Sequence, residues 1–384
     1  MQAVILAAGE GRRVRPLTWS RPKAMIPVAN QPIIAYTIDA LVTNGIRDII
    51  VVVGYRKEHV TRFLNQIDLP IEVVIQEKQL GTAHALQQTA CQIKGDFLLL
   101  PGDNYIDAQS VAKIKDIKNA VLVKEHPNPS NFGVVTVRDG RVDSIVEKPD
   151  NATSFLVSTG IYSLPADFFQ YIRGNDVTEA ISCMVESGID VHAVIADDWQ
   201  DAIYPWDLIR LNQRLLRHLP TGREGIASRH ATFQGPVHIG KGTTIGPNTV
   251  ISGPVIIGND CTIGPNSCIL PNTSIGSRVT VEPLSLLGNS IVMDDTSIAS
   301  HSRILDSIVG ERCVLGDHIS TATAGGFLEI EGKPIHSHFG AILGDHVNCG
   351  SFTRIRNGMV GNNVTFEGNR DVISRIIPDN TLVI

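Results

Sequence analysis

The chain has 384 residues, a hydrophobic content of 43% and a formal net charge of −6 at pH 7. This length exceeds what one hydrophobic core usually organises, so we expect two domains. The negative net charge disfavours general nucleic-acid binding, and no run approaches the roughly 20 apolar residues that span a membrane. Six cysteines without zinc-like spacing, and the lack of a signal-peptide pattern, favour a cytoplasmic protein with reduced thiols.

The first 220 residues alternate between strand-like and helix-like patterns. Apolar runs with the length of strands occur at 2–7, 49–53, 71–75 and 97–100. Segments with the pattern of helices occur at 33–43, 57–65, 83–92 and 206–218. This alternation predicts a Rossmann-like α/β domain with a mixed, mostly parallel sheet. An Asp-Gly turn between strand-like runs at 133–137 and 143–147 predicts a hairpin.

Aliphatic residues recur every six positions in the second part of the chain. The series is Ile239, Ile245, Ile251, Ile257, Ile263, Ile269, Ile275, Val281 and Leu287. A period of six predicts a parallel β-helix, in which each short strand points its aliphatic residue inward. The repeat blurs after Leu287 and returns at Ile298 and Ile304. We therefore expect a first domain at 1–220, a linker at 221–234 and a β-helix domain at 235–384.

A loop of small residues follows the first strand, and positively charged residues follow the loop. The loop reads Ala7-Ala8-Gly9-Glu10-Gly11, and the charges come from Arg12, Arg13, Arg15 and Lys23. Small residues let backbone N–H groups approach an anion closely, and the cationic side chains suit a polyphosphate. The spacing matches neither a Walker loop nor the dinucleotide fingerprint.

The stretch from Leu6 to Thr18, followed by Pro22-Lys23, resembles the signature of the sugar-1-phosphate nucleotidylyltransferases. The resemblance covers roughly residues 1–220. It implies that Arg13 neutralises a nucleoside triphosphate and that Lys23 neutralises the charge that builds at the α-phosphate. It also implies nucleotide contacts from the loop residues Leu6, Ala7, Ala8, Gly9 and Gly11.

A second segment, Gln-Glu-Lys-Gln-Leu-Gly-Thr from Gln76 onward, is similar to the base-reading segment of the family. The resemblance implies that Gln76, Gly81 and Thr82 contact the nucleobase. The segment does not separate users of uracil, thymine and guanine, so the base stays open.

Two aspartates are candidate Mg²⁺ ligands. Asp103 lies in a Gly-Asp-Asn turn directly after the apolar run at 97–100. The carboxyl ends of strands gather ligand chemistry in α/β sheets, and Mg²⁺ prefers oxygen ligands. Asp207, in Trp206-Asp207-Leu208, has the position of a helix-capping residue. The family resemblance implies that Asp103 and Asp207 hold Mg²⁺.

Three short motifs resemble the sugar-phosphate site of the family. They are Phe-Gly-Val around 133, Val-Glu-Lys-Pro around 147 and Ser-Thr-Gly from 158. The resemblance implies sugar-phosphate contacts from Gly133, Glu147, Lys148, Ser158 and Thr159. Members specific for N-acetylglucosamine commonly have Asn where this chain has Ser158, so the sugar stays open.

The order of domains resembles the bifunctional sugar-1-phosphate nucleotidylyltransferase/acetyltransferases, whose left-handed β-helix trimerises and binds acetyl-CoA. His301 is then the candidate base for acetyl transfer. The chain departs from that group at Ile304, Thr323, Ile335 and His338, where the family has a Tyr, an Asn and phosphate-binding lysines. A β-helix that only assembles the enzyme is the alternative.

Taken together, these patterns predict Mg²⁺-dependent nucleotidyl transfer from a nucleoside triphosphate, with UTP or dTTP favoured, to a sugar 1-phosphate. Three alternatives stay open: a bifunctional enzyme that also acetylates glucosamine-1-phosphate, a mannose-1-phosphate guanylyltransferase and a non-catalytic regulatory subunit. The charged set Arg13, Lys23, Asp103, Lys148 and Asp207 is complete, which disfavours the regulatory subunit. We expect a homo-oligomer, a trimer or a dimer of trimers, without nucleic-acid or membrane partners.

Overall fold

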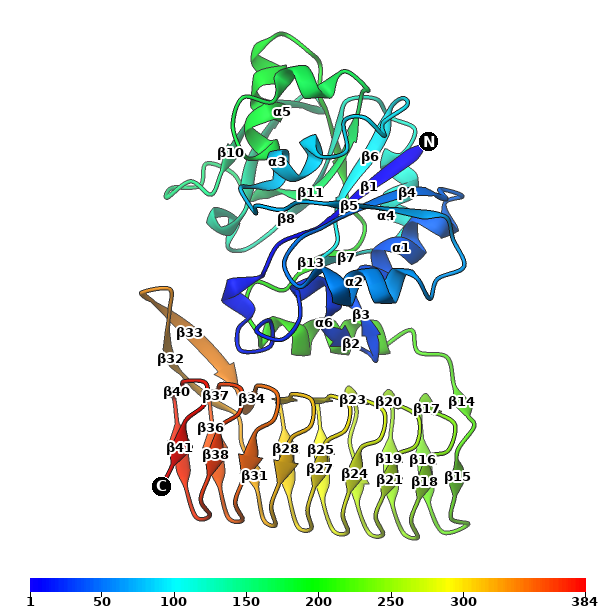
Figure 1. The fold of residues 1–384 in the computed structure, drawn as a ribbon, viewed down its shortest axis with the longest axis vertical. Coiled ribbons are helices and arrows are strands. Elements are labelled where there is room, and N and C mark those ends of the chain that lie inside the picture. The colour runs from blue at the N-terminus through cyan, green and yellow to red at the C-terminus, as the bar shows by residue number, and fades with distance from the viewer. The chain divides into compact units, whose positions relative to one another are not determined.

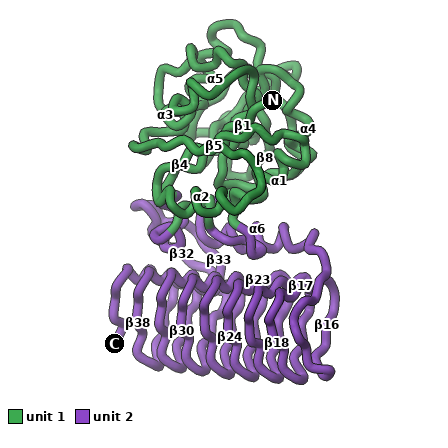
Figure 2. Tube along the Cα trace, turned by 45° about the vertical axis from the view of Figure 1, so that its right-hand side comes forward, with its two compact units in different colours: residues 1–10, 21–25, 32–201 green, residues 11–20, 26–31, 202–384 purple.

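The chain forms two compact units, which we describe separately. The structure, a computed structural model, describes residues 1–384. Unit 1 comprises Met1–Glu10, Arg21–Met25 and Pro32–Asp201, and unit 2 comprises Gly11–Ser20, Ile26–Gln31 and Ala202–Ile384 (Figure 2). Gly11–Ser20, which lies within the signature region, and Ile26–Gln31, which follows it, therefore belong to the same unit as the C-terminal part of the chain.

Unit 1 is built on a mixed sheet in the order β5-β4-β1-β6-β11-β8-β12-β10-β9 (Figure 1). Its strands are β1 (Gln2–Ala7), β4 (Asp48–Val53), β5 (Ile71–Ile75), β6 (Phe97–Pro101), β8 (Ala120–Glu125), β9 (Gly133–Arg138), β10 (Arg141–Glu147), β11 (Leu156–Leu164) and β12 (His192–Ile195). The half formed by β5, β4, β1 and β6 is parallel. Strand β11 runs antiparallel to both β6 and β8. The predicted Rossmann-like α/β fold is confirmed.

The central strands of unit 1 are buried because helices accompany the sheet. Residues Ala3, Val4 and Ile5 of β1 have no exposed surface, as expected for a parallel strand covered on both faces. The helices of this unit are α1 (Ile33–Thr43), α2 (Lys57–Leu64), α3 (Thr82–Gln87), α4 (Ala108–Ile114) and α5 (Val177–Glu186). The helix predicted at 83–92 is shorter than expected. The Thr89 hydroxyl donates to the Leu86 carbonyl at 2.7 Å, and a turn replaces the last predicted turn of helix.

Unit 2 contains a left-handed β-helix with three parallel sheets (Figure 1). Each coil contributes one strand to each sheet, except that the last coil contributes none to the third sheet. The first sheet has β14 (Gly222–Arg223), β17 (Val237–Ile239), β20 (Val255–Ile257), β23 (Thr273–Ile275), β26 (Ile291–Val292), β29 (Ile308–Val309), β34 (Ala341–Leu343), β37 (Gly358–Val360) and β40 (Ile376–Ile377). The second has β15 (Ile226–Ala227), β18 (Thr244–Ile245), β21 (Thr262–Ile263), β24 (Thr280–Val281), β27 (Ser297–Ile298), β30 (Val314–Leu315), β35 (Asn348–Cys349), β38 (Thr365–Phe366) and β41 (Leu382–Val383). The third has β16 (Thr232–Gln234), β19 (Val250–Ser252), β22 (Cys268–Ile269), β25 (Leu286–Gly288), β28 (Arg303–Leu305), β31 (Ser320–Thr321), β36 (Arg354–Arg356) and β39 (Asp371–Ile373).

The pairing register explains why the six-residue period blurs. Ile257 pairs with Ile275, 18 positions further on, which is three hexapeptides. Ile275 pairs with Val292, only 17 positions further on, so this coil is one residue shorter. The following coils keep their aliphatic residues inside, but one spacing falls to five residues in each coil of 17, as between Ile304 and Val309. A hairpin of β32 (Ala324–Ile330) and β33 (Lys333–Phe339) interrupts the series once more.

The segment expected as a linker, 221–234, forms the first coil of the β-helix. Strands β14, β15 and β16 pair in parallel with β17, β18 and β19. This pairing gives hydrogen-bond partners to the backbone groups of β17, β18 and β19, which would otherwise be the open edges of the three sheets. The polar composition of the segment therefore reflects an exposed end coil.

Helix α6 (Asp207–Leu216) belongs to unit 2, and its buried Asn212 side chain bonds to the β-helix. Its Oδ1 accepts from the Ala29 backbone N–H at 2.9 Å and from the Ser274 hydroxyl at 2.7 Å. Its Nδ2 donates to the Asn272 carbonyl at 2.9 Å. A single amide thus ties the segment around Ala29, helix α6 and a β-helix coil together, and satisfied buried networks of this kind fix geometry.

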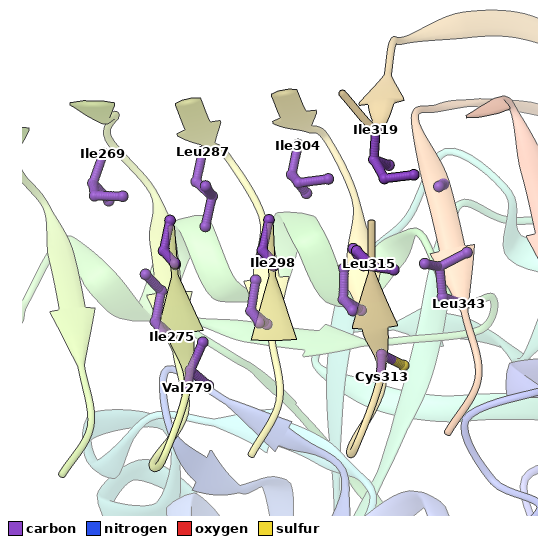
Figure 3. Close-up of a cluster of buried hydrophobic side chains, with 14 of the residues drawn as sticks. Ile269, Ile275, Val279, Leu287, Ile298, Ile304, Cys313, Leu315, Ile319 and Leu343 are labelled. Carbon is purple, nitrogen blue, oxygen red and sulfur yellow. The ribbon is translucent and has the colours of Figure 1, made fainter. Parts of the chain in front are cut away.

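The interior of the β-helix is a column of stacked aliphatic side chains, part of which Figure 3 shows. Ile275, a member of this column, is fully buried. We expect Ile275→Ala to lower the free energy of unfolding by about 2–5 kcal/mol, because a cavity opens in a packed core. The control Ile256→Ala removes a partly exposed side chain of strand β20 and should cost less than about 1 kcal/mol. Urea denaturation of both variants measures the difference, and equal costs would contradict this account of the core.

Candidate active site

The loop after β1 in unit 1 leaves an open space in front of Gly9. A Cβ atom added to Gly9 would meet no atom within 4 Å. The neighbouring Ala8 carbonyl accepts from the Tyr55 N–H at 3.0 Å, which fixes the loop on the adjoining strand end. The backbone of Gly9 is therefore accessible to a ligand at the carboxyl end of a central strand.

Asp103 is held at the same end of the sheet by a close backbone approach. The Gly102 N–H donates to the Leu6 carbonyl at 2.8 Å. A Cβ atom on Gly102 would lie 3.0 Å from Ile5 Cγ2 and 3.1 Å from Ala7 Cβ, so a larger residue would push the turn away. The glycine therefore places Asp103 just after the end of β6, beside the last residues of β1.

A buried lysine joins two carboxylates in unit 1. Lys23 has 6% of its surface exposed, and its Nζ lies 3.2 Å from Asp103 Oδ2 and 2.5 Å from Asp201 Oδ1. Asp201 ends strand β13 (Trp199–Asp201), which pairs antiparallel with β7 (Asn104–Ile106) so that Asp201 lies opposite Asn104. The pairing of β13 with β7 therefore brings Asp103 and Asp201, 98 positions apart in the chain, to one cation.

The lysine keeps its charge in this site. Burial by itself lowers the pKa of Lys23, but Asp103 and Asp201 outweigh it and raise the pKa to about 12. Because the folded-state pKa lies above the unfolded value of about 10.4, the interaction stabilises the fold fully below that value. The stabilisation is lost as the pH rises through about 12. Lys23 is consequently a permanent cation at neutral pH.

Asp103 and Asp201 fit a divalent metal. Their carboxylates are hard oxygen ligands that already share one cation, and they are 41% and 20% exposed, so a ligand can reach them. His, Cys, Asp and Glu side chains form no group of three or more that could hold a metal. A pair of carboxylates nevertheless suits Mg²⁺, which usually binds one or two carboxylates together with phosphate oxygens and water. Asp201 is absent from the sequence-based candidates, because only the strand pairing reveals it.

The base-reading candidates lie together in unit 1. Gln76 is 2% exposed, and its Nε2 donates to the Gly81 carbonyl at 3.1 Å. Gly81 has φ 138°, and a Cβ atom there would lie 2.3 Å from the Asn175 carbonyl, so only glycine fits. The Thr82 hydroxyl accepts from the Val177 N–H at 3.0 Å. Gln76 and Gly81 are thus adjacent, whereas the Thr82 side chain contacts the start of α5.

The sugar-site candidates divide into two groups. Gly133 and Glu147 face each other in the β9–β10 register, and Glu147 Oε1 lies 2.7 Å from Lys148 Nζ. These three residues form one cluster at the end of the hairpin. The Ser158 hydroxyl lies 2.8 Å from the Tyr162 hydroxyl, and the Thr159 hydroxyl donates to the Leu122 carbonyl at 2.8 Å. Both hydroxyls are buried and bonded within the protein.

Arg13 and Asp207 belong to unit 2. Arg13 lies in the short 3₁₀ helix Arg12–Val14. Asp207 Oδ2 accepts from the backbone N–H groups of Ile203 at 3.1 Å and Tyr204 at 2.9 Å. Burial raises the pKa of Tyr204, while Arg13 lowers it and Asp207 raises it, so both charges lie near the Tyr204 ring. Asp207 thus organises the turn before α6.

His301 occupies a corner of the β-helix, with φ 59°. Its ring stacks on the ring of His318 with centroids 4.8 Å apart, and His318 stacks on Phe352 at 4.6 Å. The candidate acetyl-transfer base is therefore one member of an aromatic ladder along successive coils.

The sequence also matches known families. The family described as Nucleotidyl transferase matches residues 2–217, and the family described as GMPPB C-terminal domain matches residues 251–381. The chain therefore belongs to the nucleotidyl transferase family, which confirms the resemblance seen in the signature loop. No helix has the length and apolar character that a membrane span requires.

One relative matches over the whole chain, and others match over part of it. The protein named Bifunctional protein GlmU of Methanococcus maripaludis strain S2 is 37% identical over 100% of this chain and 97% of its own length. The UTP–glucose-1-phosphate uridylyltransferase AglF of Haloferax volcanii is 36% identical over 56% of this chain and 96% of its own. A UDP-glucose pyrophosphorylase of Acinetobacter baumanii has 23% identity and a TM-score of 0.50 over 56% of this chain and 94% of its own. The last similarity concerns the fold alone.

Proposed function

We propose that the protein transfers the nucleotidyl group of a nucleoside triphosphate to a sugar 1-phosphate. A phosphate oxygen of the sugar 1-phosphate attacks the α-phosphorus, the bond from that phosphorus to the bridging oxygen breaks, and pyrophosphate leaves. The observation that carries the proposal is the buried Lys23 amine between Asp103 and Asp201 at the carboxyl end of the parallel strands. Transfers of this kind depend on positioning and charge neutralisation.

Each group in the site has a role in this scheme. The open backbone at Gly9 binds phosphate oxygens, and the permanent charge of Lys23 stabilises the negative charge that develops at the α-phosphate. Asp103 and Asp201 would hold Mg²⁺, which supplies charge neutralisation across the phosphate oxygens when bound. Glu147 and Lys148 would bind the hydroxyls and the phosphate of the sugar 1-phosphate. Arg13 would bind the triphosphate.

We further propose UTP or dTTP as the nucleotide and an assembly of identical chains through the β-helix. The name of the Haloferax relative, a UTP–glucose-1-phosphate uridylyltransferase, supports UTP. Exposed apolar side chains at the β-helix corners, Leu284 and Phe352 among them, suit contacts between copies. Light scattering of the purified protein distinguishes a trimer or a dimer of trimers from a monomer.

Pyrophosphate release from a matrix of substrates tests the proposal. The matrix combines UTP, dTTP, GTP and CTP with glucose-, glucosamine-, N-acetylglucosamine- and mannose-1-phosphate, each with and without Mg²⁺. We expect turnover with UTP or dTTP and one sugar, dependent on the metal. Turnover confined to GTP and mannose-1-phosphate would contradict the proposed nucleotide, and a folded but inactive protein would contradict the proposed reaction.

Acetyl transfer is the second candidate function, because the match to the bifunctional relative covers the whole chain. Incubation with acetyl-CoA and glucosamine-1-phosphate tests it through the release of coenzyme A. Release that disappears in His301→Ala would support His301 as the base, and release that persists would exclude it.

A further inference from the structure

The β-helix unit contains a segment of the signature region, Gly11–Ser20 (Figure 2). This segment continues the loop after β1 and carries Arg13. It is folded on itself: Gly11 is left-handed with φ 75°, and the Thr18 hydroxyl donates to the Gly11 carbonyl at 3.0 Å. Val14 and Leu17 are each only 1% exposed, so the segment has a buried apolar side.

Two buried side chains of the β-helix, Asp345 and Asn362, form hydrogen bonds to the segment Gly11–Ser20. The Asn362 Nδ2 donates to the Pro16 carbonyl at 3.2 Å. The Asp345 Oδ2 accepts from the Ser20 hydroxyl. Asn362 is 3% exposed and Asp345 is 4% exposed. Hydrogen bonds to buried charged or amide groups hold their partners firmly, because breaking them leaves a desolvated polar atom.

Both side chains are members of a ladder that repeats along one corner of the β-helix. In this ladder a side-chain oxygen accepts from a backbone N–H of the preceding coil. Asp345 Oδ1 accepts from the Glu311 N–H at 2.8 Å, and Asn362 Oδ1 accepts from the Asp345 N–H at 2.8 Å. Asp294 Oδ1 accepts from the Ser277 N–H at 2.9 Å in the same way.

The second polar atom of each side chain distinguishes the ladder members. At Asp294 it pairs with the half-exposed Arg278 at 3.2 Å. At Asp345 and Asn362 it reaches the segment that carries Arg13. The ladder bond is therefore common to the corner, whereas the bonds to Ser20 and Pro16 are specific to these two coils.

We propose that Asp345 and Asn362 are positioning residues for nucleotide binding, so that the β-helix sets the place of Arg13. This inference rests on the proposed function, in which Arg13 binds the triphosphate. The two bonds flank the 3₁₀ helix Arg12–Val14 on its C-terminal side and limit the freedom of its backbone. Small displacements of a binding group have large effects on affinity and rate.

A matched set of variants of the full-length protein tests the proposal. Ser20→Ala removes the hydroxyl that bonds Asp345 and leaves the β-helix intact, and Ser20→Thr restores a hydroxyl. Asp345→Ala removes both the ladder bond and the bond to Ser20. Asp294→Ala removes the equivalent ladder bond, together with the ion pair to Arg278, on an earlier coil, so it controls for general loosening of the β-helix.

Two readouts are expected to move together. In Ser20→Ala and Asp345→Ala the KM for the nucleoside triphosphate should rise about tenfold, while kcat and the KM for the sugar 1-phosphate change less than about threefold. Hydrogen–deuterium exchange of residues 11–20 should quicken in the same variants. Ser20→Thr should restore both readouts. The double variant Ser20→Ala/Asp345→Ala should have the same nucleotide KM as Asp345→Ala alone, because both substitutions remove the same hydrogen bond between Ser20 and Asp345.

Equal rises of the nucleotide KM in Asp294→Ala and Asp345→Ala, or unchanged exchange of residues 11–20 in Ser20→Ala, would overturn the proposal. Hydrogen–deuterium exchange is measured without substrate. It therefore tests whether the bonds from Asp345 and Asn362 hold residues 11–20 even if the wild-type protein shows no nucleotidyl transfer. A wild-type protein without nucleotidyl transfer would contradict the proposed function. Faster exchange in the variants would still support the role of the two bonds in holding residues 11–20.

Discussion

Replacing Asp103 or Asp201 with Asn is expected to slow nucleotidyl transfer by about a thousandfold, which corresponds to about 4 kcal/mol of transition-state stabilisation. Both carboxylates contact the Lys23 amine, and each would supply an oxygen ligand to Mg²⁺. An amide keeps the size of the side chain but loses the charge. Steady-state kinetics at saturating Mg²⁺ measures the effect, and circular dichroism and light scattering should show an intact fold and assembly.

Asp207→Asn is the matched comparison, because sequence reasoning assigned the second metal ligand to Asp207. Its carboxylate accepts from two backbone N–H groups, and an Asn oxygen can accept the same bonds. We expect a rate within about threefold of the wild type and a stability loss below about 1 kcal/mol. A thousandfold loss in Asp207→Asn, together with an active Asp201→Asn, would restore the original assignment and contradict the one made from the structure.

Lys23→Met is expected to lower kcat by at least about a hundredfold, because a preorganised cation at the developing charge is lost. The variant also leaves two carboxylates without their shared partner. Breaking a fully buried pair costs about 3–5 kcal/mol, but Asp103 and Asp201 are 41% and 20% exposed. We therefore expect a smaller loss of about 1–3 kcal/mol in unfolding free energy. Thermal and urea denaturation measure it.

Mg²⁺ provides an internal check on the Lys23 variant. A divalent ion can neutralise the two carboxylates in place of the amine, so Mg²⁺ should raise the Tm of Lys23→Met more than that of the wild type. Lys57→Met, which removes a half-exposed lysine 3.4 Å from Glu77, should change stability by less than about 0.5 kcal/mol. An identical Mg²⁺ response in wild type and Lys23→Met would count against a metal at Asp103 and Asp201.

The fold could be predicted largely from local patterns. The alternation of apolar runs with amphipathic segments identified the α/β part, and Ile239 to Leu287 identified the β-helix, because in each case one face of every element must be buried. The coil that ends at Val292 could not be predicted. A coil of 17 residues preserves the three-dimensional stacking of Ile275 on Val292 but breaks the sequence period.

The site was less predictable, because its residues meet through pairing between distant strands. Lys23 and Asp103 follow recognisable motifs, and the structure brings them together. Asp201 ends the short strand Trp199–Asp201, where an aspartate attracts no attention in the sequence. Only its position opposite Asn104 brings its carboxylate close to Asp103 and Lys23. The membership of Gly11–Ser20 in the β-helix unit was likewise invisible, since Ser20 and Asp345 are separated by most of the chain.

The most direct measurement of the central claim follows the oxygen atoms of the reaction. The active sugar 1-phosphate is prepared with ¹⁸O in every phosphate position and incubated with the unlabelled nucleoside triphosphate and Mg²⁺, and the products are analysed by mass spectrometry. Attack by the sugar phosphate on the α-phosphorus predicts that all of the label is found in the nucleotide-sugar and none in the pyrophosphate. Labelled pyrophosphate, or labelled inorganic phosphate without a nucleotide-sugar, would contradict nucleotidyl transfer as the activity of this site.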